Sequence, residues 1–204
     1  GLVLAAGRGS RFQSESNEQL LRLHAAEAAT QFPKVLRPVL GKPMVSYVID
    51  ALTLAGIEDI VLVVGFGADE VKRQVGPGVG YVTQPEQKGS GHAVACAKEL
   101  FERYTEHLVI MCGDSPLFSA ETVSRMMREH IQAGATVTLA SAILDEPFGY
   151  GRILRDASGR IRGIVEEKCA DSEQREIKEV NGGAYIFDSR WLYENIDKMA
   201  VNDA

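Results

Sequence analysis

Short runs of hydrophobic residues recur along the chain, and most of them are rich in β-branched side chains. Such runs predict buried strands at residues 2–6, 60–64, 81–83, 107–111 and 135–143. The runs at 2–6 and 60–64 do not alternate with polar residues. Unbroken apolar runs are typical of strands that are buried on both faces, as in parallel sheets.

The stretches between these strands have the spacing of amphipathic helices. Helices are predicted at residues 43–56, 69–75, 91–104 and 120–133. The first is bounded by Pro43, which suits the first helical position, and by Gly56, which suits a C-terminal cap. Strands that alternate with helices predict an α/β fold, with a Rossmann-like, mostly parallel sheet flanked by helices.

Two parts of the chain depart from this alternation. Residues 13–31 carry Leu and Ala on one helical face, and we interpret them as a helical surface insertion, the alternative being a flap over the first loop. After Pro147 the predicted strands are shorter, at 151–154, 161–166 and 183–187, and indicate a small substrate-facing extension. No repeat, low-complexity tract or linker is visible, so residues 1–204 are expected to form a single domain.

Composition narrows the class of protein. The chain has 45% hydrophobic and 25% charged residues, as soluble globular proteins do. No apolar run reaches the roughly 18 residues that a membrane span needs, so no membrane partner is expected. The net charge of −6 argues against non-specific nucleic-acid binding, which relies on a positive field. Three cysteines without CxxC spacing, and no visible leader segment, predict a reducing, cytoplasmic location.

The first predicted strand runs into Gly7-Arg8-Gly9-Ser10-Arg11, a loop that favours an anionic ligand. Its glycines let backbone N–H groups approach a ligand closely, and its arginines match phosphate oxygens. Phe12 stands where the dinucleotide fingerprint has its third glycine, and no Gly-Lys-Ser/Thr follows, so neither that fingerprint nor a Walker loop is predicted. The alternative is an ordinary turn with solvated arginines.

Further polar groups follow the later strands, where ligands bind in open α/β sheets. The segment from Gln84 to His92 offers carboxamides, whose paired donor and acceptor suit a pyrimidine edge, and the alternative is a polar turn in which Ser90 caps a helix. His92 itself is expected to be structural. Asp114, after the strand at 107–111, suits Mg²⁺, which takes few protein ligands, and the alternative is a turn cap.

Lys34 and a later cluster complete the candidates. Lys34 follows Pro33, which fixes the backbone direction, and it concerns a ligand only if the fold returns it beside the first loop. Gly151, Glu166 and Asn181 combine a glycine that permits close approach to a ring with side chains that hydrogen-bond to hydroxyl and amide groups. The alternative for each is a solvated surface residue.

Several motifs stand in the order of a known family. They are Leu4-Ala5-Ala6-Gly7-Arg8-Gly9-Ser10-Arg11, Pro33-Lys34-Val35-Leu36, Gly41-Lys42-Pro43-Met44, Gln84 through His92, Gly113-Asp114, Gly149-Tyr150-Gly151-Arg152, Gly163-Ile164-Val165-Glu166 and Glu179-Val180-Asn181. Over nearly its whole length the chain resembles the nucleotidyltransferase domain of the bacterial N-acetylglucosamine-1-phosphate uridyltransferases. The opening loop and Lys34 are shared widely among nucleotidyltransferases, and the Gln84 segment with Gly-Tyr-Gly-Arg is more specific.

This resemblance implies Mg²⁺-dependent transfer of a uridylyl group from UTP to N-acetylglucosamine 1-phosphate, giving pyrophosphate and UDP-N-acetylglucosamine, a cell-wall precursor. It implies that Arg11, Lys34 and Asp114 are catalytic and that Asp114 also holds the metal. The nucleotide-binding residues that it implies are Leu4, Ala5, Ala6, Gly7, Gly9, Lys34, Gln84, Gln87, Gly89 and Ser90. The sugar-binding residues that it implies are Cys112, Gly113, Gly151, Glu166 and Asn181.

The sequence departs from this family in three places. The insertion at 13–31 is longer than the family's usual connection, and Cys112 stands where a tyrosine is common. The sequence stops at Ala204, before the family's later asparagine that completes the Mg²⁺ site, so the domain is expected to be C-terminally incomplete. Full-length relatives often carry a β-helix acetyltransferase domain, which would make the protein a homotrimer. None of its hexapeptide repeats is present, so that activity is not predicted here.

Two other functions stay open at this point. One is transfer by a related sugar- or polyol-phosphate nucleotidyltransferase that uses another base or acceptor. The other is a nucleotide-sugar-binding regulatory domain without turnover. The presence of Arg11, Lys34 and Asp114 speaks against the second, because binding alone does not need all three.

Overall fold

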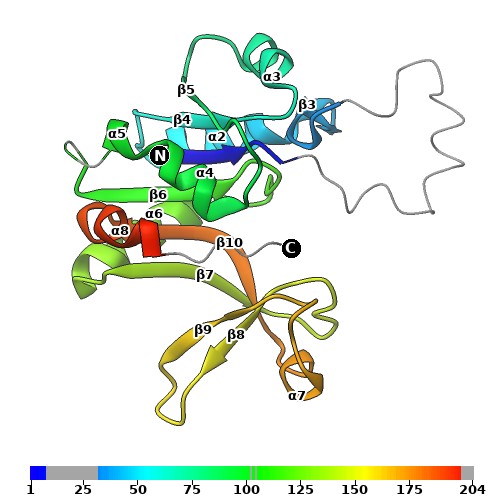
Figure 1. Ribbon diagram of the computed structural model, residues 1–204, viewed down its shortest axis with the longest axis vertical. Coiled ribbons are helices and arrows are strands. Elements are labelled where there is room, and N and C mark those ends of the chain that lie inside the picture. The colour runs from blue at the N-terminus through cyan, green and yellow to red at the C-terminus, as the bar shows by residue number, and fades with distance from the viewer. Residues whose placement is uncertain (8–31, 102, 104, 199–204) are drawn as a thin grey trace, which may run out of the picture.

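The computed structural model describes residues 1–7, 32–101, 103 and 105–198 (Figure 1). Within them, the strands of the main sheet are β1 (Leu2–Ala5), β4 (Val61–Val64), β5 (Gly80–Thr83), β6 (His107–Cys112), β7 (Val137–Ile143), β8 (Arg152–Arg155), β9 (Ile161–Val165) and β10 (Glu179–Asp188). A separate hairpin consists of β2 (Pro38–Val39) and β3 (Lys42–Pro43). The helices are α2 (Met44–Leu54), α3 (Ala68–Val75), α4 (Ser90–Cys96), α5 (Lys98–Phe101), α6 (Ala120–Ala133), α7 (Ser172–Arg175) and α8 (Ser189–Asn195), with 3-10 turns η3 (Lys34–Leu36) and η4 (Ile196–Lys198).

The main sheet is parallel on one side and antiparallel on the other. Strands β5, β4, β1 and β6 are parallel neighbours in that order. Strand β10 then pairs antiparallel with β6, β7 and β8, and β9 pairs antiparallel with β8. The predicted α/β class with a Rossmann-like parallel core is therefore confirmed, and the antiparallel strands form its second half.

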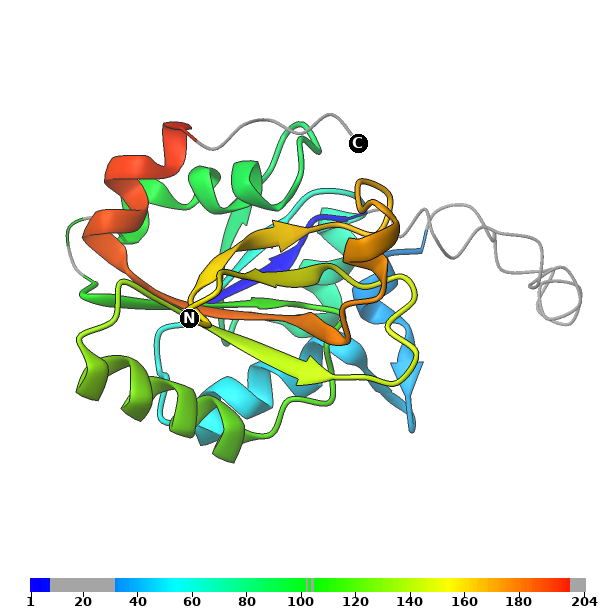
Figure 2. The ribbon, with the colours of Figure 1, turned by 90° about the horizontal axis from the view of Figure 1, so that it is seen from below.

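Helices cover both faces of the parallel strands (Figure 2). Val3, Leu62 and Val64 point into one buried layer, which α2 and α6 cover. Leu2 and Val63 point into the opposite layer, against α4, α5 and α8. Burial on both faces explains the unbroken apolar runs in these strands. No helix within the described ranges is long and apolar enough to cross a membrane.

The helix predictions are confirmed where the sequence carries clear caps. Helix α6 has the predicted bounds, because the Ser119 hydroxyl accepts the Thr122 N–H at 3.1 Å and Gly134 follows in the left-handed conformation at φ +55°. Helix α2 begins one residue later than predicted, with Pro43 as its N-cap. The single helix predicted at 91–104 is wrong: it divides into α4 and α5 at Ala97, whose N–H bonds to the Val94 carbonyl three residues back.

Strand β10 is longer than the predicted strand at 183–187. Gly182 and Gly183 lie inside β10, where its register with β7 shifts between Asn181 and Tyr185. Gly183 has φ +78°, which a glycine adopts without strain, so the pair marks a bulge. Helix α8 follows β10 directly and was not predicted, although Asp188 caps it by accepting the Trp191 N–H at 2.7 Å.

The extension beyond the parallel strands contains β8, β9 and α7 (Figure 1). A bidentate ion pair fastens it to β10: Arg155 Nε and Nη2 lie 2.7 and 2.8 Å from the two Glu179 carboxylate oxygens. Ser141 Oγ on β7 donates to the same carboxylate at 2.8 Å. The Arg155 hydrogen bonds are the main reason why the pKa of Glu179 falls to about 2.

Glu179 is predicted to make folding stability sensitive to acid. Its pKa is lower in the folded chain than in the unfolded chain, so its contribution is complete above about pH 5 and declines as the pH falls towards 2. Urea unfolding between pH 7 and pH 3 should therefore show wild type more stable than Glu179→Gln, with a difference that is constant above pH 5 and shrinks below pH 4.5. Asp145→Asn, at a side chain that is 98% exposed, is the control and should show little difference. A difference that does not depend on pH would contradict the prediction.

Candidate functional site

A backbone hydrogen bond connects the carboxyl ends of β1 and β6. The Gly113 N–H donates to the Leu4 carbonyl at 2.9 Å. A Cβ at Gly113 would lie 3.1 Å from that carbonyl oxygen and from Val35 Cγ1, so the close approach favours glycine. The side chains of Ala5 and Ala6 are buried, which leaves them only backbone groups to offer a ligand, whereas Gly7 is exposed.

The fold brings Lys34 to the carboxyl ends of β1 and β6, and a role in binding phosphate would require this position. Val35 and Leu36 of η3 are buried in the core, and this fixes the turn that carries Lys34. Lys34 Nζ forms an ion pair with Asp114 Oδ2 on the loop after β6. The two side chains are 26% and 30% exposed, so both are within reach of a ligand. A cation and a carboxylate thus meet beside the ends of β1 and β6.

Gln84, at the end of β5, is buried and makes two internal hydrogen bonds. Its Nε2 donates to the Gly89 carbonyl at 3.0 Å and lies 3.0 Å from His92 Nδ1. Because the carbonyl can only accept, the amide nitrogen must face it, and Oε1 is left without a partner among the described residues. The expected structural role of His92 agrees with this contact, whereas Ser90 does not cap α4: its N-cap is Gly89, with φ +91°. The loop also carries Gln87, which is exposed.

The three sugar-binding candidates of the extension lie next to one another. A Cβ at Gly151 would lie 3.1 Å from Glu166 Oε1, so the absence of a side chain there makes room for the carboxylate. The Asn181 N–H donates to the Gly151 carbonyl at 2.8 Å. Residues from the loop before β8, from the end of β9 and from β10 are therefore brought together.

A buried ion pair holds this cluster in place. Arg152, next to Gly151 in the chain, is 2% exposed, and its Nη2 lies 2.8 Å from Glu167 Oε2. The same carboxylate oxygen accepts the Gly149 N–H at 3.1 Å, and Arg152 donates to the Tyr150 and Arg175 carbonyls. Because an unpaired buried charge is very unfavourable, this pair fixes the glycine loop against the segment that carries Glu166.

Cys112 lies between the two groups of candidates. It is the last residue of β6, and a Cβ at Gly183 on β10 would lie 3.6 Å from its Sγ. Burial raises the pKa of the Cys112 thiol to about 11, with a further rise from Asp114 and Glu166 and an opposing effect of Lys34. Cys112 is therefore close enough to Asp114, Lys34 and Glu166 for their charges to affect it, which places the two groups of candidates near one another.

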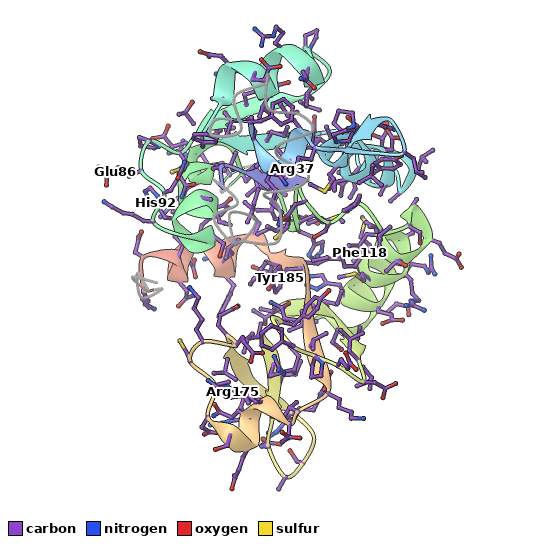
Figure 3. All side chains as sticks on the ribbon, turned by 90° about the vertical axis from the view of Figure 1, so that its right-hand side faces the viewer. Arg37, Glu86, His92, Phe118, Arg175 and Tyr185 are labelled. Atoms are coloured by element: carbon purple, nitrogen blue, oxygen red, sulfur yellow. The ribbon has the colours of Figure 1, made fainter. Side chains whose placement is uncertain are left out.

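Two residues of the site were not singled out from the sequence. Tyr185 on β10 lies between the parallel strands and the extension that carries Arg175 (Figure 3), and its hydroxyl accepts a hydrogen bond from Asn181 Nδ2 at 2.5 Å. Gly65 follows β4, and a Cβ there would lie 2.9 Å from Ala6 Cβ and 3.2 Å from the Gln84 carbonyl. A glycine directly after an apolar strand was the available signal for Gly65, whereas Tyr185 had none.

The remaining candidates lie outside the described residues. These are Gly9 and Arg11 of the opening loop, together with the insertion predicted at 13–31. Within the described part of the chain, no group of three or more His, Cys, Asp or Glu side chains could hold a metal ion. Asp114 is thus a single carboxylate at the strand end, with one oxygen paired to Lys34.

Comparison with known proteins shows the family of this chain. Residues 1–203 match the nucleotidyl transferase family. The chain belongs to that family. As a nucleotidyl transferase domain, it is 40% identical over 203 residues to the bifunctional protein GlmU of Geobacillus thermodenitrificans and 39% identical over 203 residues to that of Heliobacterium modesticaldum. The matches cover 100% of this chain and 41% of each relative.

Solved structures support the fold of this nucleotidyl transferase. A structure described as a glucose-1-phosphate thymidylyltransferase from Bacillus anthracis, in complex with a sucrose, matches with a TM-score of 0.77 at 19% identity, over 98% of this chain and 75% of that one. HddC from Yersinia pseudotuberculosis, complexed with GMP-PN, matches with a TM-score of 0.71 at 20% identity, over 95% and 78%. At these identities the likeness concerns the fold alone.

The raised pKa of Cys112 predicts low thiol reactivity. Only the thiolate reacts with alkylating reagents, and a pKa of about 11 leaves about a thousandth of the thiol ionised at pH 8. In iodoacetamide labelling followed by mass spectrometry, the exposed Cys169 should be modified about tenfold faster or more than Cys112. Cys169→Ser should remove the label at that position and leave the labelling rate of Cys112, which is followed separately from that of Cys96, unchanged. Equal labelling rates at the two positions would contradict the prediction.

Proposed function

We propose that this chain transfers a uridylyl group from UTP to N-acetylglucosamine 1-phosphate, releasing pyrophosphate and UDP-N-acetylglucosamine. The observation that carries the proposal is the meeting of Lys34 and Asp114 at the ends of β1 and β6. The Gln84 loop follows β5 on one side of this pair, and Cys112, two residues before Asp114, lies beside Gly183 of β10 on the other side. Membership of the nucleotidyl transferase family and the similarity to GlmU proteins support the same activity.

The chemistry needs charge stabilisation and alignment more than proton transfer. An anionic oxygen of the sugar phosphate attacks the α-phosphorus of UTP, a new P–O bond forms, and the bond to the β-phosphate breaks as pyrophosphate takes its electron pair. The nucleophile is already ionised, so no general base is required. Lys34, together with Arg11 from the opening loop, would neutralise negative charge on the phosphates and hold the reacting groups in line.

Asp114 is the residue that would hold Mg²⁺. One of its carboxylate oxygens pairs with Lys34, which leaves the other for a metal ligand, and its partial exposure fits an ion that keeps several waters and takes one or two carboxylates. When bound, Mg²⁺ would supply further neutralisation of phosphate charge. Lys34 would then contact the phosphates directly, and Asp114 would act on them through the metal that it holds.

The Gln84 loop would select the base. The internal hydrogen bonds of Gln84 Nε2 leave its Oε1 as the only group that it offers to a ligand. Placed opposite N3 of the base, Oε1 would accept the N3–H of uracil but would face the unprotonated N3 of cytosine, which supports the assignment of UTP over CTP. Gln87, Gly89 and Ser90 would complete the nucleotide contacts. On the sugar side, Gly151 and Gly113 permit close approach, and Glu166 and Asn181 would hydrogen-bond to the acceptor.

Substitution of the phosphate-binding pair should abolish most turnover without unfolding the chain. Lys34→Ala and Asp114→Ala are each expected to lower kcat by about a hundredfold or more, because charge stabilisation in the transition state is lost. Pyrophosphate release from UTP and N-acetylglucosamine 1-phosphate is the measurement, and circular dichroism checks the fold. Lys42→Ala, which removes the exposed ion pair between Lys42 and Asp50, is the matched control and should stay within twofold of wild type. Near-normal kcat in both site variants would rule out these roles.

The base preference is tested with the same assay and a panel of nucleotides. UTP is expected to exceed CTP in kcat/KM by about tenfold or more, because the wrong base leaves Gln84 Oε1 facing another acceptor. Gln84 does not by itself separate UTP from dTTP, since both bases have a donor at N3. A preference for CTP or GTP would reject this orientation of Gln84 and the uracil assignment with it.

A further inference from the structure

The carboxamide of Asn181 is fixed from two directions. Its Oδ1 accepts the Gly183 N–H at 3.1 Å, and its Nδ2 donates to the Tyr185 hydroxyl at 2.5 Å. The Gly183 N–H can only donate, so the amide oxygen must face it and the amide nitrogen must face Tyr185. The orientation of the Asn181 side chain is therefore set by two partners on the same strand.

This contact depends on the bulge in β10. Four residues of regular strand span about 13 Å, which is too far for a hydrogen bond between the side chains at its two ends unless they lean strongly towards each other. The register shift between Asn181 and Tyr185, with Gly183 at φ +78°, shortens that separation. The same bulge places Gly183 beside Cys112, so the pair lies at the junction between β6 and the extension.

The Tyr185 hydroxyl is a neutral acceptor for the Asn181 amide. Its oxygen accepts from Asn181, and no group in the described part of the chain accepts its O–H. Burial raises the pKa of Tyr185, and Cys112 and Glu166 add to the rise while the Asn181 hydrogen bond opposes it, so the hydroxyl stays protonated near neutral pH. Figure 3 places Tyr185 between the segment of His92 and the extension that carries Arg175.

We propose that Tyr185 is a positioning residue for the acceptor sugar phosphate, which it serves by fixing the orientation of the Asn181 carboxamide. With one N–H bound to Tyr185 and one lone pair bound to Gly183, Asn181 presents its second N–H and its second lone pair to the sugar. This inference rests on the proposed function, in which Asn181 binds that sugar. Tyr185 would therefore affect the sugar phosphate indirectly, through the Asn181 side chain.

Tyr185→Phe is the direct test, because it removes the hydroxyl and keeps the ring. In the full-length protein, we expect KM for N-acetylglucosamine 1-phosphate to rise about fivefold to tenfold, as the loss of one hydrogen bond predicts, while KM for UTP stays within twofold. A purely structural role would change both constants together or neither. Tyr81→Phe is the matched control, since it removes a tyrosine hydroxyl that donates to the Gly76 carbonyl beside β5, and it should change neither KM.

A double-mutant cycle separates positioning from direct contact. If Tyr185 acts through Asn181, then Tyr185→Phe should change kcat/KM for the acceptor by less than twofold when Asn181 is already Ala. An equal loss in both backgrounds would overturn the positioning role, as would an unchanged KM in the single variant. The proposed function is tested separately, by comparing sugar phosphates as acceptors for the wild-type protein. If the wild type prefers another sugar phosphate, the proposed acceptor is wrong, and the double-mutant cycle is measured with the preferred one.

Discussion

Strand β10 hydrogen-bonds to three other strands, and both halves of the molecule depend on this pairing. Its second half lies between β6 and β7, and its first half pairs with β7 and β8. Strand β10 changes its pairing partner at Gly182 and Gly183. Glycine suits both positions, because a Cβ at Gly182 would lie 3.0 Å from the Ala140 carbonyl and Gly183 has φ +78°. The extension is therefore held to the parallel strands by a continuous strand, which sets the position of Glu166 and Asn181 relative to Lys34 and Asp114.

The two ion pairs of the site differ in burial, and the difference fits different roles. Arg152 is 2% exposed, so loss of Glu167 would leave a buried charge without its carboxylate partner, which favours keeping this pair intact. Lys34 and Asp114 are 26% and 30% exposed, so both side chains keep contact with water, which weakens their mutual attraction. Such a pair can exchange its internal partner for phosphate or metal at little cost in stability. On the proposed function, Lys34 would turn towards phosphate, while the second carboxylate oxygen of Asp114 is already available to a metal ion.

The sequence allowed prediction of the elements that are defined by local signals. Apolar runs predicted strands β1, β4 and β6, and the residues at its two caps predicted helix α6. Strand β10 and the break at Ala97 were misjudged because tertiary contacts, and not local propensity, decide them. The structure brings Lys34 to Asp114 and Gly151 to Glu166, as the roles implied by the motif order require, and those roles themselves stay predictions. The contact of Tyr185 with Asn181 could not be foreseen, because it exists only through a bulge that alternation does not reveal.

The side-chain amides of Gln84 and Asn181 are both held in one orientation by hydrogen bonds within the chain. A free carboxamide can turn either way and so accepts ligands with opposite hydrogen-bond patterns. Internal partners remove that freedom: Gly89 and His92 fix Gln84, while Tyr185 and Gly183 fix Asn181. Each amide then offers one defined pattern, and a ligand with the wrong pattern leaves a polar group unpaired, which costs about 1–3 kcal/mol. On the proposed function, selectivity for base and for sugar would therefore depend as much on the residues behind these amides as on the amides themselves.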